Sequence, residues 1–460
     1  MSIPLSSLSR CFQGLIASAI ATCAPDGTPN VTFLSQVYYV DEKHVALSCQ
    51  FFNKTRRNVE VNPHARVEVY DPMTLDTYRL GLRYSHSETS GPLFDTMALR
   101  IQAIASVTGM EGIFRLIAAD VYEVLDVTAV PEALAAPGPQ TPRLAGPTPL
   151  TQVMGGSILS QQINRARDLD DVLEISLRAL EELFGISHAM VLVPDETGRR
   201  LVTIASRGYG EAGVGAEVAL GEGIIGTVAE QRRVLRLSAM SGDLRYGRAI
   251  RQRVADASGA PLRPEIPLPG LPGAQSQLAL PLLMQDQLVG VLALESPEAL
   301  FFDDWNEAFL QIIANQIAFA MDKHVRAADE EPAAPVAPPP IAATKPIDRA
   351  TPVRRFTFYR NDDCVFCGSD YLIRNVPGKI LWKLLTSYQH EGRKEFSNRE
   401  LRLDPNLGLP ALRDNLESRL VLLRRRLEQQ CPDLRLISTG RGRFALEVGC
   451  PIELIEKQSS

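Results

Sequence analysis

The sequence predicts a protein of several domains: one built mainly of β-strands, one α/β and one α+β. Its 460 residues are about three times the usual length of a domain, which excludes a single continuous core. Residues 131–149 and 327–353 are rich in proline and alanine and are predicted to be linkers. They leave three folded blocks, at residues 1–130, 150–326 and 354–460.

The composition is that of a soluble globular protein, with 45% hydrophobic and 22% charged residues. No stretch reaches the roughly 20 uninterrupted apolar residues that a membrane-spanning helix needs, so no membrane contact is expected. The seven cysteines are an odd number spread over a long chain, which predicts free thiols and a cytoplasmic location.

Charge is distributed unevenly along the chain. The whole sequence has a net charge of -6, but residues 354–460 hold 19 basic against 14 acidic residues, and 15 of the basic ones are arginine. Because the arginine fork matches phosphates and guanine edges, the third block is the one predicted to contact nucleic acid.

The first block has the pattern of a small β-barrel. Short segments rich in Val, Ile, Thr, Tyr and Phe alternate with turns, and one segment has helical spacing. Several antiparallel strands with a single helix predict a closed or split barrel. The strands are expected over residues 14–24, 30–40, 44–51, 65–70, 78–84 and 114–127, and the helix over 93–107.

A basic segment lies between the third and fourth of these strands. Asn53, Lys54, Thr55 and Arg57 open a short predicted helix, whose first N–H groups would also face an anion. The spacing alone is equally compatible with a solvated basic turn.

This segment, with the strand Ala46-Leu47-Ser48-Cys49-Gln50 before it and Asn62-Pro63 after it, resembles the flavin-binding split barrel of the pyridoxamine 5'-phosphate oxidase superfamily. The resemblance covers about residues 1–128. It implies a homodimer with FMN at the interface and the phosphate on the basic segment. Heme or another flavin occupies the same barrel in other members. The expected cofactor-binding residues are Ser48, Cys49, Gln50, Asn53, Lys54, Thr55 and Arg57; the arginine and histidine set of the true oxidases is missing, so no catalytic residue is assigned.

The second block resembles a GAF domain, over about residues 150–326. The resemblance rests on the Gly-punctuated segment 220–229 and the paired strands within 278–295. Segment 220–229 lacks the Lys-Ser/Thr ending of a P-loop. A GAF domain implies a small-molecule ligand or dimerisation, and this block has no cysteine to attach a bilin. Its helices are expected over 169–184 and 303–325 and its other strands over 189–194 and 201–206.

The third block resembles the winged-helix output domain of two-component response regulators. Three helices precede a hairpin around Gly440, and Ser397 is placed to cap the second helix. Strands are expected over 355–360, 364–376 and 434–447, and helices over 377–387, 397–401 and 412–429.

The long helix of this block predicts a DNA-contacting face. Leu416, Leu420, Leu423 and Leu427 form one stripe that must face the core. Polar and basic residues on the opposite side, together with the hairpin, would converge on one groove of DNA. A merely solvated face or a protein-binding face is the alternative. The residues predicted to contact DNA are Asn415, Ser418, Arg419, Arg425, Arg426, Arg441 and Arg443.

Four cysteines of the third block permit several interpretations. Cys364 and Cys367 form a CxxC pair, which is half of a zinc or iron–sulfur site, and Cys431 and Cys450 could complete it. Ordinary thiols or a redox-sensitive CxxC dithiol are the alternatives.

Together, the three blocks predict a cytoplasmic transcriptional regulator that responds to a ligand or to redox state. The flavin-type barrel and the GAF domain would sense, and the winged helix would bind DNA. The alternative is a flavin-dependent oxidase or reductase regulated by the other two blocks, so enzymatic activity is left open.

Overall fold

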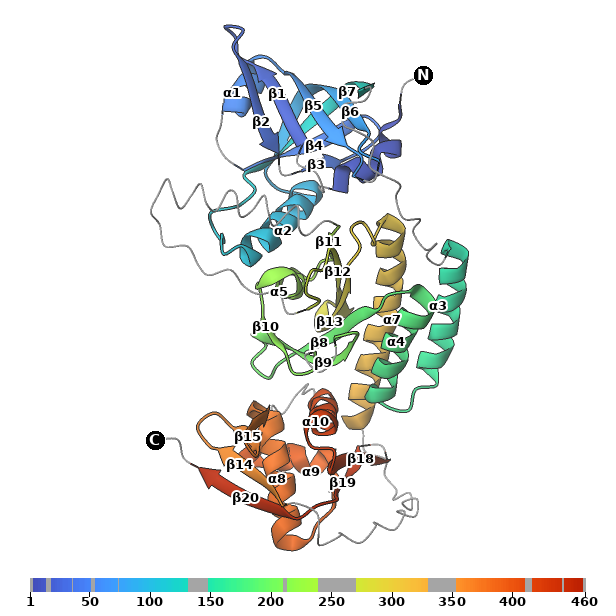
Figure 1. The fold of residues 1–460 in the computed structure, drawn as a ribbon, viewed down its shortest axis with the longest axis vertical. Coiled ribbons are helices and arrows are strands. Elements are labelled where there is room, and N and C mark those ends of the chain that lie inside the picture. The colour runs from blue at the N-terminus through green and yellow to red at the C-terminus, as the bar shows by residue number, and fades with distance from the viewer. Residues whose placement is uncertain are drawn as a thin grey trace. The chain divides into compact units, whose positions relative to one another are not determined.

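The computed structural model describes residues 3–13, 18–34, 36–50, 54–72, 74–130, 148–209, 213–238, 270–329, 353–409, 416–440 and 442–457. The chain forms two compact units. One comprises Met1–Thr148, Leu220–Leu280 and Ala293–Leu310, and the other Pro149–Ala219, Pro281–Leu292 and Gln311–Ser460. Figure 1 labels most of the helices and strands. No helix in the described residues is long and apolar enough to cross a membrane.

The first block is an antiparallel half-barrel of seven strands in the order β2-β1-β5-β6-β7-β4-β3. The predicted strand 30–40 is two strands, and the short helix η1 was not predicted. The elements are η1 (Leu5–Gln13), β1 (Ser18–Cys23), β2 (Pro29–Leu34), β3 (Val37–Tyr39), β4 (His44–Cys49), α1 (Lys54–Val61), β5 (His64–Tyr70), β6 (Thr77–Glu88), α2 (Pro92–Val107) and β7 (Ala118–Val130).

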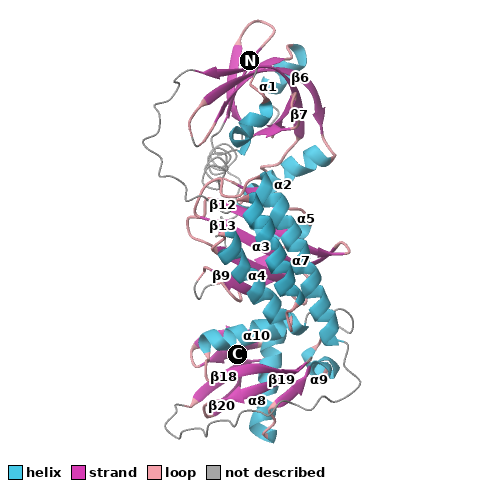
Figure 2. Cartoon of the chain, turned by 90° about the vertical axis from the view of Figure 1, so that its right-hand side faces the viewer, coloured by secondary structure: helices cyan, strands magenta, loops and turns pink. Residues whose placement is uncertain are grey.

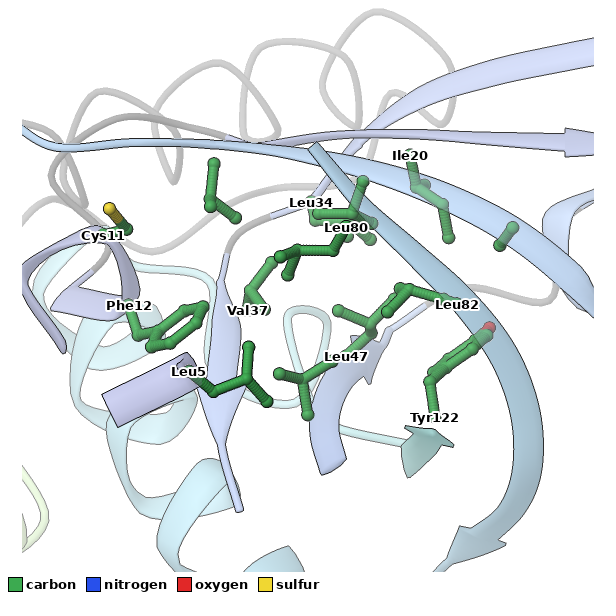
Figure 3. Close-up of a cluster of buried hydrophobic side chains, with 14 of the residues drawn as sticks. Leu5, Cys11, Phe12, Ile20, Leu34, Val37, Leu47, Leu80, Leu82 and Tyr122 are labelled. Atoms are coloured by element: carbon green, nitrogen blue, oxygen red, sulfur yellow. The ribbon is translucent and has the colours of Figure 1, made fainter. Parts of the chain in front are cut away.

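Two hydrophobic clusters fix the strands of this sheet. The cluster drawn in Figure 3 fills the barrel with side chains such as Ile20, Leu80 and Tyr122, and Phe12 of η1 packs against it. The second cluster places Met97 and Ile101 of α2 against β4 and β7. Because β4 contributes to both clusters, its side chains from Val45 onward are buried on both faces, which holds its end in a fixed position.

The second block has a six-stranded sheet in the order β10-β9-β8-β13-β12-β11. Figure 2 shows α3, α4 and α7 side by side. The sequence correctly predicted α4, which begins at the N-cap Asp168 and ends at the left-handed Gly185. Its elements are α3 (Pro149–Asn164), α4 (Leu169–Phe184), β8 (His188–Pro194), β9 (Arg200–Arg207), β10 (Glu217–Ala219), α5 (Gly223–Gln231), β11 (Leu235–Leu237), β12 (Ser276–Met284), β13 (Gln287–Ser296) and α7 (Asp304–Asp329).

The third block has two small sheets, ordered β16-β15-β14-β20 and β17-β19-β18. The three helices and the following hairpin are present in the predicted order, and Ser397 caps α9 by accepting a hydrogen bond from the Glu400 N–H. The predicted strand 364–376 is two strands with a left-handed turn at Gly368. The elements are β14 (Arg354–Tyr359), β15 (Cys364–Cys367), β16 (Asp370–Ile373), α8 (Asn375–Glu391), β17 (Glu395–Ser397), α9 (Asn398–Leu403), η3 (Pro405–Leu407), α10 (Leu416–Gln430), β18 (Leu434–Gly440), β19 (Arg443–Val448) and β20 (Ile452–Lys457).

Candidate functional site

The predicted cofactor residues lie at the end of β4 and the start of α1. Ser48, Cys49 and Gln50 are buried, whereas Lys54 opens α1 and is exposed. Thr55 is buried and Arg57 is exposed. Asn53 lies outside the described residues. The structure therefore separates this set into a buried floor and an exposed cationic turn.

Hydrogen bonds tie the inner face of α1 to the sheet. The Asn30 side-chain amide donates to Thr55 Oγ1 over 2.9 Å, and the Asn58 amide donates to Thr22 Oγ1 over 3.1 Å. Both bonds join α1 to β1 and β2. With Thr55 and Asn58 turned inward, Lys54 and Arg57 remain on the solvent side of the helix.

Arg56 was not among the predicted site residues, although it stands in the same basic run. Its guanidinium donates to Asp120 Oδ1 on β7 over 3.1 Å and to Cys49 Sγ over 3.7 Å. Ser87 on β6, directly opposite Asp120 in the sheet register, also donates to Asp120 over 2.6 Å. No local sequence pattern links these partners, because the sheet topology alone brings β4, β6 and β7 together.

Burial governs the protonation of this network. It raises the pKa of Asp120, against the opposing effects of the Ser87 hydrogen bond and the Arg56 charge. Burial and the Asp120 charge likewise raise the pKa of Cys49, so that this side chain is a neutral thiol at neutral pH. Arg56 is thus paired with two carboxylates, the buried Asp120 at 3.1 Å and the exposed Glu60 at 3.2 Å, unlike Lys54 and Arg57.

The exposed turn has the donors that a phosphate requires. Within the described part of the chain, Lys54 and Arg57 form no ion pair with a carboxylate. The two exposed cations and the N–H groups of the first turn of α1 are the donors available to an anion, whereas the Thr55 hydroxyl faces the sheet. The residues present therefore fit the phosphate of FMN in the chemistry of the donor set.

The predicted DNA-contacting side of α10 is not exposed. Ser418 is 2% and Arg419 8% exposed, because α10 packs against β9 and α4 as well as against α8 and β16. The expectation of a solvent-facing surface at these two positions is therefore wrong. Arg443 on β19 is exposed, and Asn415 and Arg441 lie outside the described residues.

Two further arginines of α10 are engaged within the protein. Arg425 donates to Asp170 of α4 over 2.9 Å, and Arg426 donates to the Leu372 carbonyl over 3.0 Å. Burial lowers the pKa of Arg426. The sequence pattern identified the core stripe of α10 correctly, with Leu416, Leu420, Leu423 and Leu427 all buried, but the opposite side is occupied by protein contacts.

The four cysteines of the third block do not converge as one set. Cys364 and Cys367 are three residues apart on β15, so their side chains leave opposite faces of the strand. Cys364 Sγ donates to the Asp362 carbonyl over 3.4 Å, whereas Cys367 is buried beside Cys431. The described residues contain no group of three or more Cys, His, Asp or Glu placed to hold a metal ion.

The fold defines the first block as an antiparallel half-barrel domain with an exposed cationic turn, and the second as an α/β domain. Residues 8–125 match the family model of pyridoxamine 5'-phosphate oxidase, and residues 166–322 match that of the GAF domain. The chain therefore contains a domain of the pyridoxamine 5'-phosphate oxidase family followed by a GAF domain, as the sequence resemblances predicted. The winged helix remains a prediction.

Solved structures with similar domains are distant in sequence. The GAF domain of a phosphoenolpyruvate-protein phosphotransferase from Acinetobacter is 22% identical with a TM-score of 0.31, over 37% of this chain and 93% of that one. An FMN-binding protein from Syntrophomonas wolfei subsp. wolfei is 17% identical with a TM-score of 0.23, over 28% and 86%. A free methionine-R-sulfoxide reductase from Neisseria meningitidis is 16% identical with a TM-score of 0.29, over 38% and 89%. These similarities carry no argument about activity, and no curated protein matches the chain.

Proposed function

We propose that this protein is a flavin-dependent sensor, in which the first domain binds FMN and the GAF domain binds a small molecule. The observation that carries the proposal is the cationic turn of Lys54 and Arg57 at the start of α1, in a domain of the pyridoxamine 5'-phosphate oxidase family. Among the described residues, Lys54 and Arg57 form no ion pair with a carboxylate, so both positive charges are available to an anion.

Each residue of the site has a separate role in this proposal. Lys54 and Arg57 bind the phosphate as exposed charges, and Thr55, which accepts from Asn30, holds α1 on the sheet behind them. Cys49 lines the floor as a neutral thiol, while Arg56 fixes the end of β4 to β7 through Asp120. When bound, FMN supplies reversible uptake of one or two electrons.

FMN binding can be tested by titration with a matched ligand. Lys54→Ala and Arg57→Ala are each expected to weaken FMN binding about tenfold, because each removes a charge-assisted contact. Lys43→Ala, an exposed cation at the other end of β4, is the control and should leave the affinity unchanged. Riboflavin lacks the phosphate, so its binding should not respond to either substitution. Equal losses for riboflavin and FMN would contradict the assignment of the phosphate site.

A flavin-dependent oxidase or reductase is the competing function of the same barrel. Steady consumption of a reduced nicotinamide or of a pyridoxine vitamer by the FMN-loaded protein would favour the enzyme. Bound flavin without turnover favours the sensor, and an absorption spectrum of the purified protein distinguishes flavin from heme.

The implied homodimer is part of the proposal. The edge strand β2 exposes Val31 and Phe33, at 68% and 67%, which is a large apolar area for an edge strand. Light scattering should give twice the mass of one chain, and Phe33→Glu should yield a monomer that binds FMN more weakly.

Transcriptional regulation through the third block is the more specific form of the proposal. Binding of DNA by α10 requires this helix to leave α4, because Arg425 is bound to Asp170 and Arg419 is buried. Asp170→Asn removes the carboxylate that holds Arg424 and Arg425 and is expected to strengthen a mobility shift on DNA. Absence of any shift at low salt, for both the wild type and the variant, would remove DNA from the proposal.

A further inference from the structure

Three buried thiols gather in the third block from elements far apart in the sequence. Cys367 ends β15, Cys431 follows α10 and Cys450 precedes β20, and their exposed fractions are 8%, 0% and 1%. Cys364 of the CxxC pair is not part of this group. The cluster belongs to neither the cofactor site nor the GAF domain.

The strand pairing explains why the segments that carry these thiols lie near one another. Cys367 lies opposite Phe356 of β14, and the start of β14 pairs in parallel with the start of β20, where Arg354 faces Ile452. The segment that follows α10 is tied to the same place, because Asp433 pairs with Arg354 at 3.0 Å and its carbonyl accepts from the Gly449 N–H over 2.8 Å. Each of these links lies inside the third block.

Cys367 and Cys431 are the two thiols of this group whose side chains interact directly, whereas Cys450 acts on them through its charge. The interaction with Cys431 lowers the pKa of Cys367 to about 7, against the effect of burial and with help from the Arg354 charge, and the pKa of Cys431 is raised. At neutral pH a fraction of Cys367 is therefore a thiolate beside the Cys431 thiol.

We propose that Cys367 and Cys431 are an oxidisable pair that forms an intramolecular disulfide when the protein meets a peroxide. The Cys367 thiolate attacks one oxygen of hydrogen peroxide, which gives a sulfenic acid on Cys367 and releases hydroxide. The Cys431 sulfur then attacks the Cys367 sulfur, so that the S–S bond forms and water leaves with the Cys431 proton. The two thiols lose two electrons to the peroxide, which is reduced to two water molecules once the hydroxide takes up a proton.

A peroxide suits this site because both sulfurs are covered. A small uncharged oxidant can reach a side chain that is 8% exposed, whereas a bulky disulfide such as oxidised glutathione cannot approach it. The new bond would join β15 to the end of α10, the helix predicted to contact DNA. It would thereby couple the oxidation state of the block to the position of that helix.

Peptide mapping of the full-length protein tests the proposal. After brief treatment with hydrogen peroxide and alkylation of the remaining thiols, mass spectrometry under non-reducing conditions should find Cys367 linked to Cys431. Cys364→Ser and Cys450→Ser should retain the link, and Cys431→Ser should abolish it and leave Cys367 as a sulfenic or sulfinic acid. Cys431→Ala serves the same purpose if the serine is poorly tolerated at a fully buried position.

The pH dependence gives a second, independent measurement. The rate of disulfide formation should rise with pH around a midpoint near 7, where the Cys367 thiolate forms. The charged and titratable groups facing it are Arg354, Asp370, Asp433, Cys431 and Cys450. Arg354→Gln should move the midpoint to higher pH.

Two results would overturn the proposal. One is a Cys364–Cys367 link in place of the predicted one. The other is recovery of Cys367 and Cys431 as alkylated thiols in unfolded samples after peroxide treatment that oxidises a free cysteine control completely. The wild-type mapping decides between these outcomes without depending on how any variant folds.

Discussion

Replacement of Arg56 by methionine tests the network at the floor of the candidate site. The substitution puts an apolar side chain of similar length in place of Arg56 and removes the charge that lies 3.1 Å from Asp120. The side chain of Asp120 is only 9% exposed, so its carboxylate would be left buried with a hydrogen bond from the Ser87 hydroxyl and no positive charge from Arg56.

The size of the effect follows from this geometry. An opposite charge at hydrogen-bond distance favours the ionised form of a carboxyl group by about 1.4 to 4 kcal/mol. Because the Arg56 side chain is 21% exposed and partly screened, we expect the lower part of this range, about 2 kcal/mol, at pH 7.5.

The loss of stability caused by Arg56→Met should depend on pH. Burial holds the pKa of Asp120 above its ordinary value, and the Arg56 interaction counts only while Asp120 is ionised. The contribution of Arg56 to stability is therefore present while Asp120 is ionised and is lost as the pH falls through the pKa of Asp120 in the folded state. The difference between wild type and variant should shrink on acidification.

Hydrogen exchange of the β4 and β7 peptides, followed by mass spectrometry, measures the opening free energy of the first block alone. Asp120→Asn is the matched control, because it keeps the hydrogen-bond acceptor and removes the charge. In that background Arg56→Met should cost less than about 1 kcal/mol, because the exposed Arg56–Glu60 pair is the ion pair still lost. An equal cost in both backgrounds, or a cost that does not shrink on acidification, would show that Arg56 acts through packing and would refute the electrostatic explanation.

Two further predictions concern the other blocks. Gly378→Ala in α8 would bring a Cβ to 2.2 Å from the Asp363 carbonyl oxygen, so we expect the third block to lose about 2 to 3 kcal/mol of stability. Hydrogen exchange of the α8 amides should become faster. Unchanged exchange would show that the turn at Asp363 can shift freely. Leu173→Ala in α4 removes a side chain that is 0% exposed and should lower the stability of the second block by about 2.7 to 5 kcal/mol. Hydrogen exchange of the β8 and β9 peptides measures this loss, with peptides of the first block as the internal control. A loss below about 1 kcal/mol would mean that the surrounding side chains collapse into the cavity.

Local patterns predicted the regular elements well where each end carried its own signal. Helix α4 has an aspartate cap, a periodic leucine stripe and a closing glycine, and its bounds agree with the prediction. Helix α3 lacked such signals and was not predicted. Its Gly155 approaches so near to Phe184 that an added Cβ would lie 2.9 Å from the ring, so small residues that weaken the helical pattern are what permit the packing.

The candidate site was predictable only where it is local. Residues Ser48 to Gln50 and Lys54 to Arg57 are nearly contiguous, so one motif located both parts. Asp120 and Ser87 reach the site because β6 pairs with β7, and a short stretch of sequence does not predict that pairing. The same holds for the third block, where Cys364 and Cys367 leave opposite faces of β15 and Cys431 interacts with Cys367 from beyond the end of α10, a pairing that the CxxC spacing alone does not indicate.

The parallel pairing of β14 and β20 has a consequence for how the third block assembles. These strands hold the first and last regular segments of the block, and the Arg355–Glu453 ion pair between them spans 98 residues. Few local contacts can compensate the entropy lost in closing so long a loop, so this pairing should form late in folding. During synthesis, one edge of β14 therefore stays unpaired until the ribosome has released the rest of the block. The third block is most prone to misassembly during this interval.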